Sequence, residues 1–92
     1  MHILFKDDST VDVLRIHKMR DFETQEVRVN IDLVPGTDVD EVAEKDFSDI
    51  LVKRLGMPDV QLEGFELTDI SEMYEDHATT VSMNLTKNRP TG

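Results

Sequence analysis

Apolar and polar residues alternate over most of the first nineteen residues. Ile3 and Phe5 share one face of a first strand, and the two valines of TVDV share a face of a second strand that can pair with it. Between them, KDDST supplies Asp and Ser side chains that bond to the nearby backbone and favour turns. The pattern predicts a hairpin with strands near residues 2–6 and 10–19.

The apolar positions shift by one residue after Val13, which indicates either a bulge in the second strand or a strand with both faces partly covered. DFETQ, residues 21–25, is typical of a turn. EVRVNIDLV then alternates cleanly and gives the strongest strand pattern in the chain. The side chains expected to point inward from it are those of Val27, Val29, Ile31 and Leu33.

Residues 37–56 have the pattern of an amphipathic helix. Thr37 is a suitable N-cap, Gly56 suits a left-handed C-cap, and Pro58 prevents continuation. Val52 is expected to face solvent. The apolar side chains recur at steps of three and four residues and form one stripe: Val39, Val42, Ala43, Phe47, Ile50, Leu51 and Leu55.

The closing third of the chain returns to strand patterns. VQLEGFEL changes parity at Gly64, which again indicates a bulge. TTVSMNLTK alternates, with Thr79, Val81, Met83 and Leu85 on one side. The intervening TDISEMYEDHA fits either a short helix or a wide loop; we expect the strand to continue to about residue 70 and a loop to follow. Residues 88–92 are expected to form a flexible tail.

The predicted order is therefore β-β-β-α-β-β, without a repeat or a linker. A helix between antiparallel ribbons has to bury its apolar stripe on a sheet face. We expect one α+β domain over residues 1–87, in which an antiparallel sheet carries one amphipathic helix packed on a face.

Composition bounds the class of protein. The 92 residues suit one domain, and the 38% hydrophobic content supports a modest core. The absence of cysteine excludes disulfides and thiolate metal sites and is typical of a reducing compartment. Neither a signal peptide nor a run of about 20 apolar residues is present, so we expect a protein that is not secreted and does not enter a membrane.

The formal net charge of −10 is concentrated in one part of the chain. Residues 38–76 hold 13 acidic and 3 basic side chains, and the remaining segments are neutral in sum. This field repels nucleic acid and anionic membranes and attracts basic protein partners, although it can also serve solubility alone. The candidate partner-binding residues are Asp38, Glu41, Glu44, Asp49, Glu63, Glu66, Glu72, Glu75 and Asp76.

Other chemistry finds little support in the sequence. DVDEVAEKD lacks the glycine and the terminal glutamate of a calcium-binding loop, and YEDH lacks a second histidine at ligand spacing. His2, His17 and His77 are scattered, and no glycine-rich phosphate loop is present. We therefore expect no metal site, no cofactor and no enzymatic activity.

Basic residues gather in the second and third strands, where acids interleave with them. This mixture cancels the field that phosphate binding requires, so we expect cross-strand ion pairs and no direct binding to nucleic acid. The bases are Arg15, Lys18, Arg20 and Arg28, and the acids are Asp12, Asp21, Glu23 and Glu26.

The opening ILFKDDSTVDVLRI resembles the start of small proteins encoded among the tail genes of tailed phages and prophages, in which a short strand leads into an F-K-D-G-[ST] turn. LEGFEL and TTVSMNLTK are similar to their closing half. Asp8 stands where those proteins carry glycine. The resemblance implies a β-rich accessory or structural protein without catalytic residues, in the cytoplasm of a bacterial host or in a virion.

The expected function is therefore contact with other proteins, as a tail-associated or other virion component. A partner's strand could pair with an unprotected sheet edge, and the sequence is also compatible with a homo-oligomer. The alternative is an inhibitor that imitates nucleic acid and blocks a DNA- or RNA-binding enzyme of the host, for example in a defence system.

Overall fold

A computed structural model describes residues 1–75 and 77–88 of the chain. Its strands form one antiparallel sheet of seven strands in the order β5-β4-β1-β2-β3-β7-β6. The elements in chain order are β1 (His2–Leu4), β2 (Thr10–Arg20), β3 (Glu26–Leu33), α1 (Val39–Ala43), β4 (Asp49–Lys53), β5 (Val60–Glu63), β6 (Glu66–Glu75) and β7 (Ala78–Asn88).

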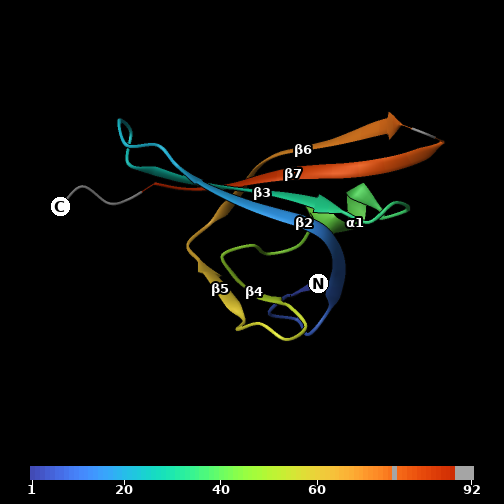
Figure 1. The fold of residues 1–92 in the computed structure, drawn as a ribbon, viewed down its shortest axis with the longest axis horizontal. Helices are drawn as coiled ribbons and strands as arrows, with labels where there is room; N and C mark the ends of the chain where they lie inside the picture. The colour runs from blue at the N-terminus through green and yellow to red at the C-terminus, as the bar shows by residue number, and fades with distance from the viewer. Residues whose placement is uncertain (76, 89–92) are drawn as a thin grey trace.

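The sheet is folded into two layers because β2 bends (Figure 1). Residues 10–12 of β2 pair with β1, and the strand pairs with β3 from Val13 onward. The register shifts between Val13 and Arg15, so of the two alternatives left by the sequence the bulge is the one present. Bulges let a strand turn the corner between two packed sheets. We call β5, β4, β1 and the start of β2 the lower layer, and the rest of β2 with β3, β7 and β6 the upper layer.

The core lies between these layers. The inward apolar side chains at the middle of β3 and β7 are fully buried, as the alternation of both segments predicts, whereas Val27, Thr79 and Lys87 near the strand ends are half-buried. Burying one such aliphatic side chain stabilises the fold by about 1.5–3 kcal/mol. Side chains that lose all contact with water include Val29, Ile31, Leu33, Val81, Met83 and Leu85 above, and Ile3 and Val52 below.

The expected α+β class is wrong. Among the described residues the only helix is α1, which has five residues, with Asp38 rather than Thr37 as its N-cap and Glu44 as its C-cap. The Asp38 carboxylate accepts from the backbone N–H groups of Asp40, at 3.0 Å, and Glu41, at 3.3 Å. So short a helix depends on packing for its stability. The protein is a two-layered antiparallel β structure, and within residues 1–75 and 77–88 no long amphipathic helix covers a sheet face.

The second half of the expected helix is strand β4. The Asp46 carboxylate accepts from Ser48 N–H, at 2.9 Å, and this turn separates α1 from β4. Ile50 and Val52 alternate into the core, so the expectation that Val52 faces solvent is wrong. Leu55, placed in the apolar stripe by the helical pattern, lies in the next turn and is 101% exposed.

The closing segment differs from expectation in two respects. Gly64, with φ of 76°, separates two strands of different layers rather than forming a bulge within one, and its N–H donates to Ser48 O at 2.7 Å. The bulge of β6 lies between Leu67 and Asp69. The expected loop after residue 70 is also wrong, because β6 continues to residue 75 and forms a hairpin with β7.

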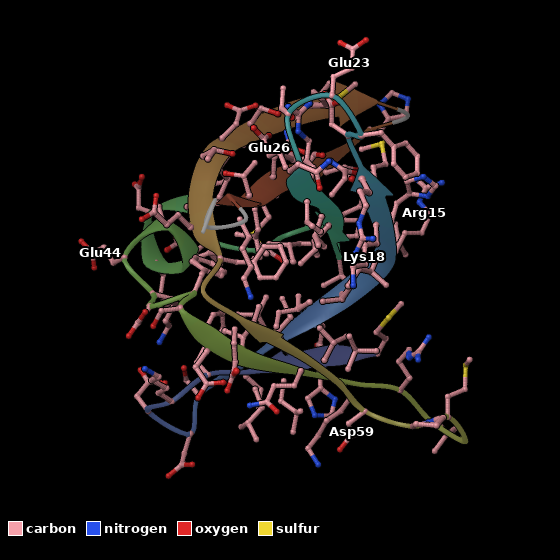
Figure 2. All side chains as sticks on the ribbon, turned by 90° about the vertical axis from the view of Figure 1, so that its left-hand side faces the viewer. Arg15, Lys18, Glu23, Glu26, Glu44 and Asp59 are labelled. Atoms are coloured by element: carbon pink, nitrogen blue, oxygen red, sulfur yellow. The ribbon has the colours of Figure 1, made fainter. Side chains whose placement is uncertain are left out.

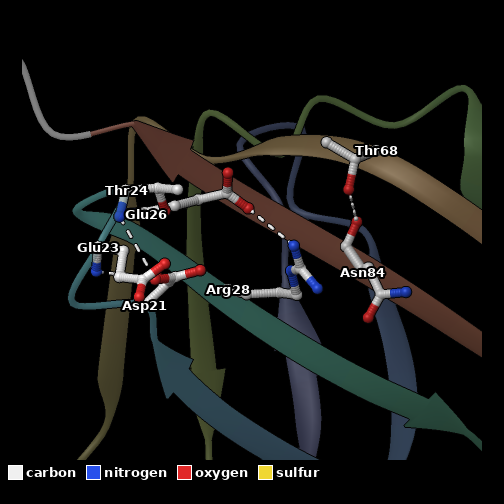
Figure 3. Close-up of polar contacts among 7 residues, drawn as sticks. All are labelled: Asp21, Glu23, Thr24, Glu26, Arg28, Thr68 and Asn84. Carbon is white, nitrogen blue, oxygen red and sulfur yellow. Dashed lines mark hydrogen bonds and ion pairs between the residues drawn. The ribbon is translucent and has the colours of Figure 1, made fainter.

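The turn between β2 and β3 is held by its own side chains, as Figure 3 shows. The Asp21 carboxylate accepts from the N–H groups of Glu23, at 2.9 Å, and Thr24, at 3.3 Å. This confirms the turn expected over residues 21–25. Asn88, the last residue of β7, pairs with Glu26 at the same end of the sheet as this turn, and residues 89–92 of the expected tail lie outside the described residues.

Candidate partner-binding surface

Strand β6 forms one edge of the sheet. It pairs with β7 on one side, and no other backbone hydrogen bond reaches it within the described part of the chain. The opposite edge is β5, which has only four residues. A long edge strand presents a row of unpaired N–H and C=O groups that can pair with another strand. With ten residues, β6 is the longer of the two open edges.

The end of the β6–β7 hairpin projects beyond the rest of the upper layer (Figure 1). The pairing of β3 with β7 ends at Val81, whereas β6 and β7 pair on to residues 75 and 78. Two large apolar side chains of this projecting part are open to solvent. Met73 is 51% exposed and Tyr74 is 71% exposed.

The acids of β6 lie on both of its faces. Glu66 and Asp69 stand opposite Thr86 and Asn84 of β7, on the outer face of the upper layer. Glu72 stands opposite the buried Val81 and therefore lies on the inner face.

The bulge in β6 decides which acids share a face. It places one extra residue, Thr68, between Leu67 and Asp69, so that Asp69 stays on the side of Glu66. The Thr68 hydroxyl donates to Asn84 O at 3.1 Å and holds the bulge against β7 (Figure 3).

Helix α1 packs beside β6 and adds acidic side chains there. Glu41 and Glu44 are exposed, and Glu44 projects away from the body of the protein in Figure 2. Asp38 has a different role, because its carboxylate caps the helix. Of the candidate acids, Glu41, Glu44, Glu66 and Glu72 are thus on the two elements that meet at this edge.

The other candidate acids lie elsewhere. Asp49 and Glu63 stand opposite each other on β4 and β5, in the lower layer. The Gln61 side-chain amide donates to both carboxylates, at 3.2 Å and 3.1 Å. The side chain of Glu75 and all of Asp76 lie outside the described residues.

Within the described residues, the acids of β6 and α1 form no ion pair. The ion pairs present are Lys6–Asp46, Arg15–Asp32, Arg28–Glu26, Lys45–Asp7 and Lys53–Asp59, with N–O distances of 3.1 to 3.8 Å. The ladder expected between β2 and β3 is not formed: among the described residues the one cross-strand ion pair there is Arg15–Asp32, whose acid was not expected to take part, and Arg28 pairs with Glu26 of its own strand. The negative charge of the β6 edge is therefore not neutralised by neighbouring bases.

Among the residues that the structure describes, two carboxyl groups have clearly shifted pKa values, and both belong to turns. Hydrogen bonds from Ser9 lower the pKa of Asp7 to about 2, and hydrogen bonds from Ser48 lower the pKa of Asp46. Neither group lies on β6 or α1. Groups of three or more side chains placed to hold a metal ion are not found in residues 1–75 and 77–88.

Sequence reasoning missed Asp69, Met73 and Tyr74 as candidates for this surface. Met73 and Tyr74 are adjacent apolar residues among polar ones and do not follow the alternation of a strand. This departure from alternation was the feature of the sequence that could have indicated them.

Searches of protein-family models, of curated proteins and of solved structures found no match to this chain. None of the helices in the described part of the chain is long and apolar enough to cross a membrane.

Proposed function

We propose that this protein is a non-enzymatic phage or prophage protein that acts by contact with another protein, in a virion tail or another structural assembly. The partner contributes a basic, strand-forming segment that pairs with the outer edge of β6. The observation that supports this most is the edge of β6, a strand of ten residues whose backbone pairs only with β7 among the described residues and whose acids are unpaired on both of its faces.

Addition of a strand to β6 uses both its unpaired backbone groups and its side chains. The backbone of an added strand takes up the unpaired N–H and C=O groups, and its alternate side chains meet those of β6 on each face. Glu66 and Asp69 on one face and Glu72 on the other therefore favour a segment with Lys or Arg on both sides. Attraction between these charges weakens as salt increases.

The projecting apolar pair provides the second part of the contact. Met73 and Tyr74 lie on opposite faces of the hairpin, since their β7 partners are the consecutive residues Thr80 and Thr79. Covering an exposed apolar side chain is worth up to about 1.5–3 kcal/mol. A partner strand that extends along β6 to the hairpin would cover part of both.

The same acids disfavour pairing between two copies of β6. Antiparallel pairing of this edge with itself would bring strands with Glu66, Asp69 and Glu72 side by side and place like charges close together. We therefore assign the edge to a different protein.

The phage setting is supported by the resemblance at the two ends of the chain. In its first turn, Asp8 has φ of 68°, the left-handed conformation that glycine adopts most easily, at the position where the resembling proteins carry glycine. This setting places the protein in the cytoplasm of a bacterial host or in the virion, without secretion and without a cofactor.

An inhibitor that imitates nucleic acid is the alternative function, and the net charge of −10 favours it. Such an inhibitor has to present its carboxylates as rows on one continuous face. Glu66 and Glu72 lie on opposite faces of β6, and Asp49 and Glu63 lie in the other layer. That distribution suits an edge contact better than imitation of a phosphate backbone.

The test is capture of partners by the tagged full chain from the bacterium that carries the gene and from virions released by it. Glu66→Lys with Glu72→Lys reverses two charges on the β6 edge. Asp12→Lys with Glu23→Lys makes the same charge change at exposed sites away from it. We expect a virion protein with a basic strand-forming segment to be retained by the wild type and the control, and to be lost from the edge variant.

Equal retention by the edge variant and the wild type would contradict the proposal. Capture of a nucleic-acid-binding enzyme that is released by Glu41→Lys with Glu44→Lys, but not by the edge variant, would favour the inhibitor instead.

A further inference from the structure

A cleft of about 510 Å³ opens where the lower and upper layers separate, at the end of the molecule that carries the β2–β3 turn. Its apolar lining comes from Val27 of β3, from Leu62 of β5 and from Phe65 in the connection to β6. Three bases line it as well, namely Lys18, Arg20 and Lys87. The volume is within the range of about 300–1,000 Å³ that is usual for small-molecule sites.

The three bases lie on the inner face of three strands of the upper layer. Arg20 pairs with Val27, and Val27 pairs with Lys87, so Arg20 and Lys87 flank Val27 in one row across the sheet. Two strand spacings separate their backbones by about 10 Å, a gap that two long side chains can close over one ligand. Lys18 lies one inward position along β2 from Arg20.

The sequence did not predict this grouping. It placed Lys18 and Arg20 in one patch with Arg15 and Arg28, but alternation along β2 and its register with β3 divide the four bases between the two faces. Figure 2 shows Lys18 turned toward the space between the layers and Arg15 on the outer side.

The charges in the cleft are not neutralised. Lys18, Arg20 and Lys87 take part in none of the ion pairs found among the described residues. The Lys87 ammonium lies 5.9 Å from the centre of the Phe65 ring, which orients it without cancelling its charge. Glu63 is the one acidic side chain that the described residues contribute to the lining, and it accepts from the Gln61 amide at 3.1 Å.

We propose that this cleft binds a small organic phosphate, with the phosphate between Lys18, Arg20 and Lys87 and the apolar part against Val27, Leu62 and Phe65. A phosphate carries the two negative charges and several acceptor oxygens that three converging cations can satisfy. The acids of the rest of the chain do not prevent this, since at physiological salt charges beyond about 8 Å are largely screened. The site is independent of the contact proposed for β6.

Titration of the full chain with phenyl phosphate and with inorganic phosphate, followed by amide NMR, tests the site. We expect both probes to shift the amides of residues 18–20, 27, 62–65 and 85–87. Phenyl phosphate should bind about tenfold more tightly, because only its ring covers the apolar lining.

Three variants make the test specific. Lys18→Gln with Arg20→Gln should weaken phenyl phosphate binding at least about tenfold. Arg15→Gln with Arg28→Gln removes the same charge from the opposite face and should change the affinity less than about twofold. Glu63→Gln should strengthen binding, because it removes the one acid of the lining. The melting temperature of each variant shows whether the fold is retained.

Equal weakening by both double variants would mean attraction to net charge alone and would overturn the proposal. Equal affinity for the two probes would contradict the proposed contact between the apolar lining and the ligand. Binding of a glutamate-rich peptide, without any response to either phosphate, would overturn the phosphate site and assign the cleft to a protein ligand.

Discussion

The rings of Phe5 and Phe47 pack edge to face, with centroids 5.3 Å apart and planes at 79°. Phe5 follows β1, and Phe47 lies in the segment between α1 and β4, where no regular element holds it. Both side chains are buried. The contact therefore packs the segment after α1 against the lower layer, where the chain continues into β4.

Replacing Phe47 with alanine should lower the free energy of unfolding by about 3–5 kcal/mol, the usual range for a buried phenylalanine. Phe47→Leu keeps most of the apolar volume and should lose less, about 1–2 kcal/mol. Urea denaturation followed by circular dichroism measures both values. A loss below about 1 kcal/mol for Phe47→Ala would mean that this ring is not part of the core.

Val52 and Leu55 provide a direct test of strand β4. Val52 is fully buried opposite Ile3, whereas Leu55 is fully exposed. Val52→Ala should therefore lower the free energy of unfolding by about 2 kcal/mol, and Leu55→Ala should change it by less than about 0.5 kcal/mol. A helix over residues 37–56 requires the reverse order, so the same pair of denaturation curves distinguishes the two structures.

Asp7 links the first turn to acid stability. Its side chain accepts from Ser9 N–H at 3.0 Å and from the Ser9 hydroxyl, which lowers its pKa from 3.8 to about 2. A carboxyl with a lowered pKa in the folded state favours folding above pH 4, and this contribution is lost as the pH falls from about 4 to about 2. An NMR titration of the Asp7 carboxyl should have its midpoint near 2 in the wild type.

The matched variant for that titration is Ser9→Ala, which removes the hydroxyl donor and keeps the backbone donor. Its Asp7 midpoint should move back toward 3.8. A wild-type midpoint already at 3.8 would contradict the hydrogen-bonded turn.

Strands that have one face on the core could be predicted from the sequence. β3 and β7 alternate because their inward side chains fill the space between the layers, and the bulge after Val13 appeared as a shift of the same alternation. Residues 49–53 could not be assigned in this way. Ile50 and Leu51 fit a helical stripe that leaves Val52 in solvent, but the same run of apolar residues also fits a strand, and tertiary pairing with β1 decides for the strand.

The candidate surface was only partly accessible to sequence reasoning. Glu66 and Glu72 were candidates because of local charge, but an edge exists only through the order in which distant strands pair. β6 also lacks an alternating pattern, because polar side chains occupy both of its faces where the hairpin leaves the core. The basic cleft depends even more on long-range pairing, since the register between β3 and β7 brings Lys87 into the row of Arg20.

Hydrogen exchange of the chain, free and bound to the captured partner, tests the central claim most directly. Strand addition predicts that amides within residues 66–75 exchange at least about tenfold more slowly in the complex, while those of β5, the other edge, remain unchanged. Protection confined to α1, with the amides of β6 exchanging as in the free protein, would contradict the edge contact.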